Sequence, residues 1–126
     1  MGSIGGMKLN HLNLRVKDSQ ACREFYEQYF GFRFVFEADG GQCLRNEDGF
    51  LLALIPVSSH QSLPAGFHIG FTLAVAEAEA VVAMHGQLGA ARRVGPLEDG
   101  GAAEDYISFR CWDPDGTEIE VFWDGV

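Results

Sequence analysis

The sequence lacks the features that mark membrane proteins and nucleic-acid-binding proteins. No apolar run approaches the roughly 20 residues that a membrane helix needs. Nine basic residues stand against eighteen acidic ones, which gives a net charge of −9 and leaves no basic cluster to attract nucleic acid or anionic lipid. We therefore expect neither a nucleic-acid partner nor a membrane partner.

Cysteine is also scarce. Cys22, Cys43 and Cys111 form no close pair and are odd in number, which argues against a disulfide framework and against a zinc knuckle. The first ten residues lack the charged and apolar regions of a signal peptide, so the expected location is cytoplasmic. Residues 1–6 are rich in glycine and precede a second methionine, and we interpret them as a tag or a flexible arm.

The 126 residues suit one domain, and they contain one pattern twice. In the first copy, about 7–57, the pattern predicts a strand at 8–16, a helix from Asp18 or Ser19 to Gly31, and strands at 32–38, 42–45 and 50–57. In the second copy, about 66–124, it predicts a strand at 67–74, a helix at 76–88 that ends at Gly89, and strands at 91–94, 106–112 and 118–123. The predicted class is α+β, with two βαβββ modules in one domain.

The repeat relates three potential metal ligands. Laying His11 on His68 keeps the apolar faces of the two first strands in phase, and the last strands then align Ala53 with Glu120. By strand alternation His11, His68 and Glu120 all lie on the face opposite the apolar residues. Two imidazoles and a carboxylate suit Mn²⁺, Fe²⁺, Co²⁺, Ni²⁺ or Zn²⁺ and leave coordination positions open. The alternative is that each histidine is hydrogen-bonded scaffolding in its strand. His60, in the linker between the two copies, and His85, on the second predicted helix, are expected to be surface residues.

Other side chains share the predicted polar face. Arg110 can hold an anionic oxygen of a substrate, or it can simply pair with Glu118, and Tyr106 can donate a proton or a hydrogen bond. Asn13, Arg15 and Thr72 are further candidates, while Cys43, opposite Arg110 in the repeat, has no neighbouring base to activate it. We expect 98–105 to be a mobile loop, with a lid as the alternative, and Phe32, Phe34 and Phe36 to be core.

Four segments together resemble the vicinal oxygen chelate superfamily, which includes glyoxalase I, fosfomycin-resistance thiol transferases, extradiol dioxygenases and bleomycin-resistance proteins. These segments are residues 11–18, 25–32, 67–71 and 113–121, and the likeness spans about 7–123. The resemblance implies a cupped mixed sheet around a divalent metal, with helices outside, commonly completed by exchange between two subunits of a dimer. It also implies that His11, His68 and Glu120 are the ligands. Glyoxalase I adds a fourth ligand where this chain has Ala53, so a three-ligand activity is favoured.

The predicted function is therefore a metal-dependent enzyme acting on a small oxygen-rich molecule by Lewis-acid catalysis, as a lyase, thiol transferase or dioxygenase. The expected homodimer is implied by the resemblance and not by the sequence pattern itself. The alternative is a drug-sequestering or other small-molecule-binding protein without turnover. Metal-free bleomycin-binding members typically lack the three ligands, which argues against that alternative. The substrate, the metal, and whether one chain or two supply the ligands stay open at this stage.

Overall fold

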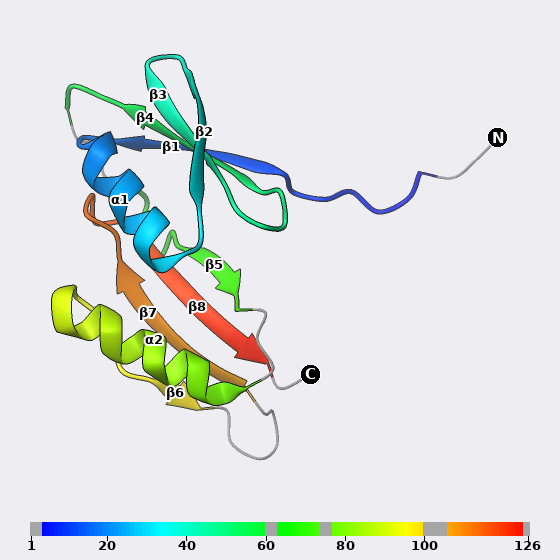
Figure 1. Cartoon of the computed structure of the whole chain (residues 1–126), viewed down its shortest axis with the longest axis vertical. Helices are drawn as coiled ribbons and strands as arrows, with labels where there is room; N and C mark the ends of the chain where they lie inside the picture. Colours follow the sequence, from blue (N-terminus) through cyan, green and yellow to red (C-terminus); the bar gives the residue numbers. More distant parts are fainter. Residues whose placement is uncertain (1–3, 60–62, 74–76, 100–105, 125–126) are drawn as a thin grey trace. The chain divides into compact units, whose positions relative to one another are not determined.

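The computed structural model describes residues 4–59, 63–73, 77–99 and 106–124. The chain divides into two compact units, Met1–Gln61 and Ser62–Val126, which are described one at a time. Each unit combines one main helix with a four-stranded sheet (Figure 1).

The first unit follows the predicted βαβββ order. Its elements are β1 (His11–Val16), α1 (Ser19–Tyr29), β2 (Arg33–Ala38), β3 (Gly41–Arg45) and β4 (Leu51–Pro56). The sheet order is β1-β4-β3-β2, with β1 and β4 parallel and the other pairs antiparallel. The first strand begins at His11, three residues later than predicted, and residues 4–10 extend from it without regular structure (Figure 1).

Local sequence explains where α1 begins and ends. The Asp18 side chain accepts a hydrogen bond from the Ala21 N–H at 3.0 Å, and Gly31 follows the helix with a φ of +70°, as predicted. Cys22, Phe25 and Tyr26 are buried on the helix face that contacts β2, β3 and β4. Burial of each large side chain in this cluster contributes about 1.5–3 kcal/mol.

The prediction that Phe32, Phe34 and Phe36 share a core face was wrong for Phe36. The pairing of β2 with β3 shifts between Phe34 and Phe36, because Phe34 pairs with Leu44 and Phe36 with the adjacent Cys43. This β-bulge at Val35 moves Phe36 to the opposite face of the sheet, where it is 43% exposed.

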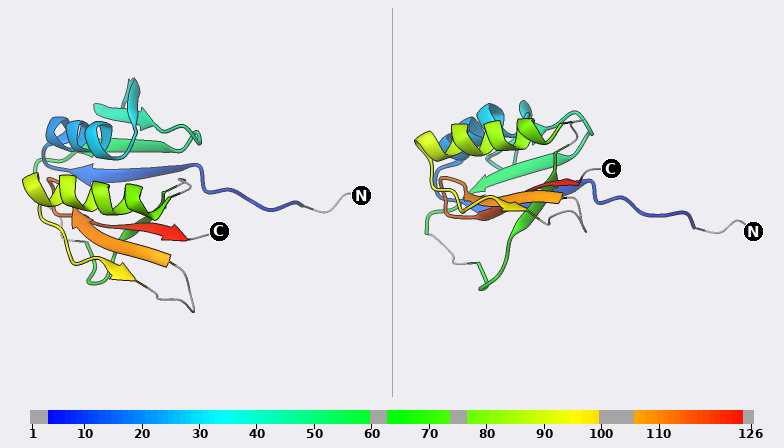
Figure 2. Two further views of the ribbon diagram at one scale, coloured as in Figure 1. Left: turned by 60° about the horizontal axis from the view of Figure 1, so that its bottom comes forward. Right: turned by 90° about the horizontal axis from the view of Figure 1, so that it is seen from below.

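The second unit repeats the first. Its elements are β5 (Ile69–Thr72), α2 (Ala78–Ala91), β6 (Glu98–Asp99), β7 (Tyr106–Trp112) and β8 (Glu118–Asp124). The sheet order is β5-β8-β7-β6, again with one parallel pair, β5 with β8. Figure 2 shows α2 along one side of this sheet, where it contacts β7. The predicted α+β class with two βαβββ modules is confirmed.

Two predictions around α2 were wrong. The helix does not end at Gly89, whose backbone has no positive φ, but continues to Ala91. The strand predicted at 91–94 is therefore reduced to a single bridge between Val94 and Cys111. The edge strand is instead β6, which pairs with β7 in the stretch predicted to be a loop. Residues 100–105 of that loop and His60 lie outside the described residues.

His85 is also not the surface residue that we predicted. Its Nε2–H donates to the Gly95 carbonyl at 2.8 Å, and its ring meets Phe109 edge to face with centroids 5.1 Å apart. The reason is helical spacing, since Val81 and Leu88, one turn away on either side, are fully buried.

The two sheets have the same register. Asn13 pairs with Ala53 across β1 and β4, and Gly70 pairs with Glu120 across β5 and β8. These are the positions that the repeat aligns, so Ala53 does occupy the place of Glu120.

In the part of the chain that is described, no helix is long and apolar enough to cross a membrane.

Candidate metal centre

An imidazole and a carboxylate converge in the second unit. His68 lies immediately before β5, and Glu120 lies on β8, the strand that pairs with β5. His68 Nε2 is 3.8 Å from Glu120 Oε1, and the two side chains are 36% and 25% exposed. The structure thus brings together two of the three predicted ligands.

The other ring nitrogen of His68 fixes its tautomer. Nδ1 lies 2.9 Å from the Gly66 carbonyl oxygen. A carbonyl can only accept, so Nδ1 must carry the hydrogen, and a neutral ring then presents its lone pair at Nε2, toward Glu120. Sequence reasoning missed Gly66, although a glycine two residues before a candidate ligand was a usable signal.

A second carboxylate on β8 is engaged elsewhere. Arg110 Nη1 donates to Glu118 Oε2 in a close ion pair, which confirms the pairing that the sequence offered as an alternative. Glu118 Oε2 is also 4.0 Å from His68 Nδ1. Because Arg110 neutralises Glu118, Glu120 is the carboxylate left to face His68 Nε2.

Tyr106 lies at the other end of β7. It shares a strand face with Arg110 by alternation, but the two positions are four residues apart along the strand, which corresponds to roughly 13 Å. Its ring stacks on Phe122 with centroids 5.2 Å apart and planes inclined by 15°. Phe122 is two residues beyond Glu120 on β8, so the stack forms a flat wall on the same face; Phe122 was missed from the sequence.

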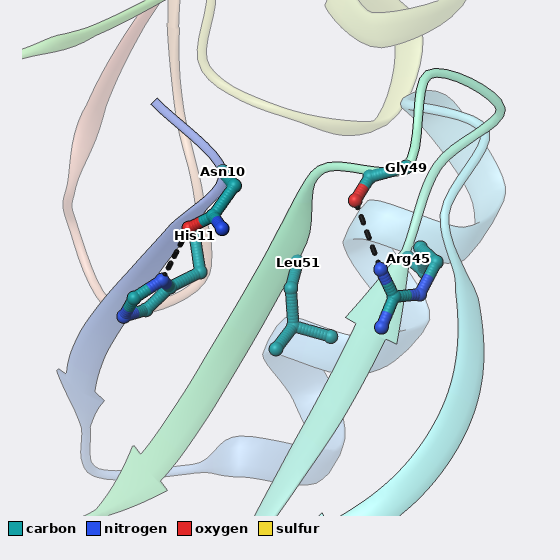
Figure 3. Close-up of a pocket in the computed structure, with 5 residues that line it drawn as sticks. All are labelled: Asn10, His11, Arg45, Gly49 and Leu51. Carbon is teal, nitrogen blue, oxygen red and sulfur yellow. Dashed lines mark hydrogen bonds between the residues drawn. The ribbon is translucent and has the colours of Figure 1, made fainter. Parts of the chain in front are cut away.

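The first unit holds His11 in an equivalent way. Its Nδ1–H donates to Asn10 Oδ1 at 2.6 Å, which again directs the lone pair of a neutral ring to Nε2 (Figure 3). His11 and Asn10 line a pocket of about 220 Å³ together with Arg45, Gly49 and Leu51. Arg45 Nη1 donates to the Gly49 carbonyl at 3.0 Å (Figure 3). Asn13 and Arg15, on the same strand face, are exposed.

In the first unit, the residue that pairs with Ala53 cannot serve as the missing metal ligand. Ala53 is 4% exposed and pairs with Cys43, as Glu120 pairs with Arg110. Burial raises the pKa of the Cys43 thiol, and the Asp39 carboxylate raises it further. The thiol therefore stays protonated and is neither an activated nucleophile nor a ready metal ligand.

The donor set fits a divalent metal, although the described residues contain no group of three or more histidine, cysteine, aspartate or glutamate side chains close enough to hold one. Two ligands at about 2.1 Å from a tetrahedral ion lie about 3.4 Å apart. His68 Nε2 and Glu120 Oε1, at 3.8 Å, need to approach by only a few tenths of an ångström. His11 belongs to the first unit and has the matching tautomer.

Comparisons with known proteins agree with this architecture. Residues 8–121 match the family model of the Glyoxalase/Bleomycin resistance protein/Dioxygenase superfamily. A possible glyoxalase from Bacillus cereus is 33% identical, with a TM-score of 0.76 over 92% of this chain and 98% of that one. No protein of curated function matches this chain.

More distant solved structures share the fold. The fosfomycin resistance protein FosX from Listeria monocytogenes is 19% identical, with a TM-score of 0.73 over 96% of this chain and 94% of that one. Lactoylglutathione lyase from Agrobacterium tumefaciens is 18% identical, with a TM-score of 0.68 over 94% of each chain.

Proposed function

The chain belongs to the glyoxalase/bleomycin resistance protein/dioxygenase superfamily, and on that premise we propose that it is a divalent-metal-dependent enzyme with His11, His68 and Glu120 as metal ligands. The observation that carries the proposal is the convergence of His68 Nε2 and Glu120 Oε1 at 3.8 Å, with the hydrogen of the imidazole held on the far nitrogen. Manganese, iron, cobalt, nickel and zinc all suit this donor set.

A bound ion would supply Lewis-acid stabilisation of negative charge on substrate oxygens. Arg110 would orient the substrate, because a guanidinium paired with Glu118 on one side keeps in-plane N–H donors for an anionic oxygen on the other. The Tyr106 hydroxyl would donate a hydrogen bond or a proton to the bound substrate, while its stack on Phe122 limits the motion of the ring.

The absence of a ligand side chain at Ala53 narrows the set of reactions that the site can catalyse. A methyl group in the place of Glu120 adds no fourth protein ligand, so more of the coordination sphere is open to a small oxygen-rich substrate. The fold itself does not choose the reaction class, because a fosfomycin resistance protein and a lactoylglutathione lyase both share it. We favour a three-ligand thiol transferase, dioxygenase or lyase over a four-ligand glyoxalase I, with the cup completed between two subunits of a homodimer.

Metal analysis tests the proposal. Protein prepared without chelator should hold roughly one divalent ion per chain, or take it up from added Mn²⁺, Fe²⁺, Ni²⁺ or Zn²⁺. His68→Ala and Glu120→Gln should each lose the ion, whereas His85→Gln should keep it, because His85 donates to Gly95 and packs on Phe109. Circular dichroism would check that each variant is folded.

Two results would count against metal-dependent catalysis. Parent protein that takes up none of these ions would favour the alternative, a protein that sequesters a small molecule without turnover. Equal metal content in His68→Ala and the parent would remove His68 from the site.

A further inference from the structure

A second pocket lies at one end of the sheet in the second unit, where the chain leaving α2 meets the turn between β7 and β8. Its volume is about 490 Å³, and it is lined by Ala91, Arg92, Arg93, Trp112, Asp113, Pro114 and Gly116. None of these residues belongs to the proposed metal centre. The bridge between Val94 and Cys111 brings their sequence neighbours Arg93 and Trp112 side by side.

The Arg93 guanidinium lies over the Trp112 ring, 3.9 Å from its centroid. Among the described residues, no carboxylate forms an ion pair with Arg93, although the chain has twice as many acidic as basic residues. Arg23 shows the more usual arrangement, since it lies 4.3 Å from the Phe34 centroid and also pairs with Glu27 at 3.1 Å.

Stacking determines which part of Arg93 remains available. At 3.9 Å from the ring centroid the guanidinium is at the distance of face-to-face stacking on the indole, a geometry in which its N–H donors point outward in the plane of the group. In-plane donors of this kind bind carboxylate or phosphoryl oxygens, often two at a time. Arg92 adds a second positive charge to the lining.

The one carboxylate in the lining belongs to Asp113, which is 4% exposed. Its Oδ1 accepts hydrogen bonds from the Asp115 and Thr117 N–H groups, each at 2.9 Å, so it fixes the turn. Asp113 thus stabilises its own turn, and among the described residues it forms no ion pair with Arg93.

We propose that this pocket binds an oxyanion of a small molecule, a carboxylate or phosphoryl group, through the in-plane donors of Arg93 held against Trp112. The competing explanation is that the two arginines only offset the negative end of the α2 dipole. That explanation predicts a loss of stability when Arg93 is replaced and no ligand binding by the parent. The proposal stands apart from the metal centre, so it holds or fails independently of it.

Fluorescence of Trp112 provides the test. The chain has two tryptophans, so a Trp123→Phe background isolates the signal of Trp112. Inorganic phosphate and benzoate would be titrated separately, at an ionic strength kept constant with sodium chloride. We expect a saturable change with at least one anion, weakened tenfold or more by Arg93→Gln. Arg93→Lys, which keeps the charge but not the planar fork, should lose most of the affinity.

A matched variant completes the design. Arg23→Gln removes an arginine that lies over an aromatic ring in the first unit, and it should bind like the parent. The stronger anion identifies the ligand class as phosphoryl or carboxylate. A change that stays linear for both anions, or equal affinity in the parent, Arg93→Gln and Arg93→Lys, would overturn the proposal.

Discussion

The ring of His68 is oriented by the backbone carbonyl of Gly66. Gly66 has a φ of +84°, in the left-handed region, and its carbonyl accepts the Nδ1 hydrogen of His68. A Cβ at Gly66 would meet no atom within 4 Å, so any effect of a side chain there acts through the backbone and not through a clash. The backbone conformation at Gly66 therefore places the carbonyl that holds the hydrogen on Nδ1, and this leaves the lone pair of His68 on Nε2.

Gly66→Ala should accordingly weaken metal binding by about tenfold, the scale on which partners of metal-ligating histidines act. Gly66→Asn should stay close to the parent, because asparagine tolerates a positive φ better than alanine does. Isothermal titration of the metal-free proteins with Zn²⁺ would measure both. Equal affinities in all three proteins would show that the Gly66 carbonyl does not orient His68.

Cys111 makes stability depend on pH in the alkaline range. Burial raises the pKa of its thiol from 9.0 to about 12, with a further contribution from Asp113. The folded protein keeps a proton that the unfolded chain releases, so this stabilisation is complete below pH 9.0 and is lost as the pH rises toward 12. In Cys111→Ala the free energy of unfolding should fall less steeply across that interval, as measured by urea denaturation. Parallel curves for variant and parent would contradict this expectation.

At the level of elements, β3 leaves no room for a side chain against β4 at Gly41. A Cβ at this position would lie 2.5 Å from the Leu54 carbonyl oxygen and 2.8 Å from Ile55 Cδ1. The first of these atoms is backbone in a paired strand and cannot move aside alone. Gly41→Ala should destabilise the protein by about 1–3 kcal/mol in urea denaturation.

Gly86 provides the contrasting substitution. It lies inside α2, and a Cβ there would meet nothing within 4 Å. Gly86→Ala should stabilise the protein by about 0.5–1 kcal/mol, since alanine is the better helix former. Similar losses in both variants would show that the contact at Gly41 is not the cause.

Local sequence predicted the elements whose limits are set by nearby residues. Asp18 and Gly31 marked the limits of α1, and the alternation in 106–112 gave the full extent of β7. The bulge at Val35 was not predictable, because it depends on how β2 pairs with β3 and not on its own residues. Gly89 is a similar case: a glycine there predicts the end of a helix, but α2 continues to Ala91.

The same distinction between regular and irregular structure applies to the candidate site. Strand alternation was enough to place His68 and Glu120 on one face, since that requires only a period of two. The acceptor at Gly66 and the stacking of Arg93 on Trp112 were missed, because each contact depends on a turn or a bridge outside the regular pattern.

For the whole molecule, the repeat raises the question of which chain completes the proposed metal centre. His68 and Glu120 are paired within one unit, whereas His11 belongs to the other. We propose that His11 comes from a second subunit, and sedimentation should then show a mass near twice that of the chain. A monomer that binds metal would require all three ligands to come from one chain.

A heterodimer of two defective chains distinguishes these arrangements directly. His11→Ala and His68→Ala, carried on chains with different affinity tags, can be co-expressed and the mixed dimer purified through both tags. If the site is shared, the intact His11 of one chain meets the intact His68 and Glu120 of the other, and the mixed dimer should bind about one ion while each parental homodimer binds none. If each chain closes its own site, every site in the mixed dimer lacks a ligand. A mixed dimer without metal would therefore exclude a shared site, provided that wild-type dimers prepared in the same way are loaded.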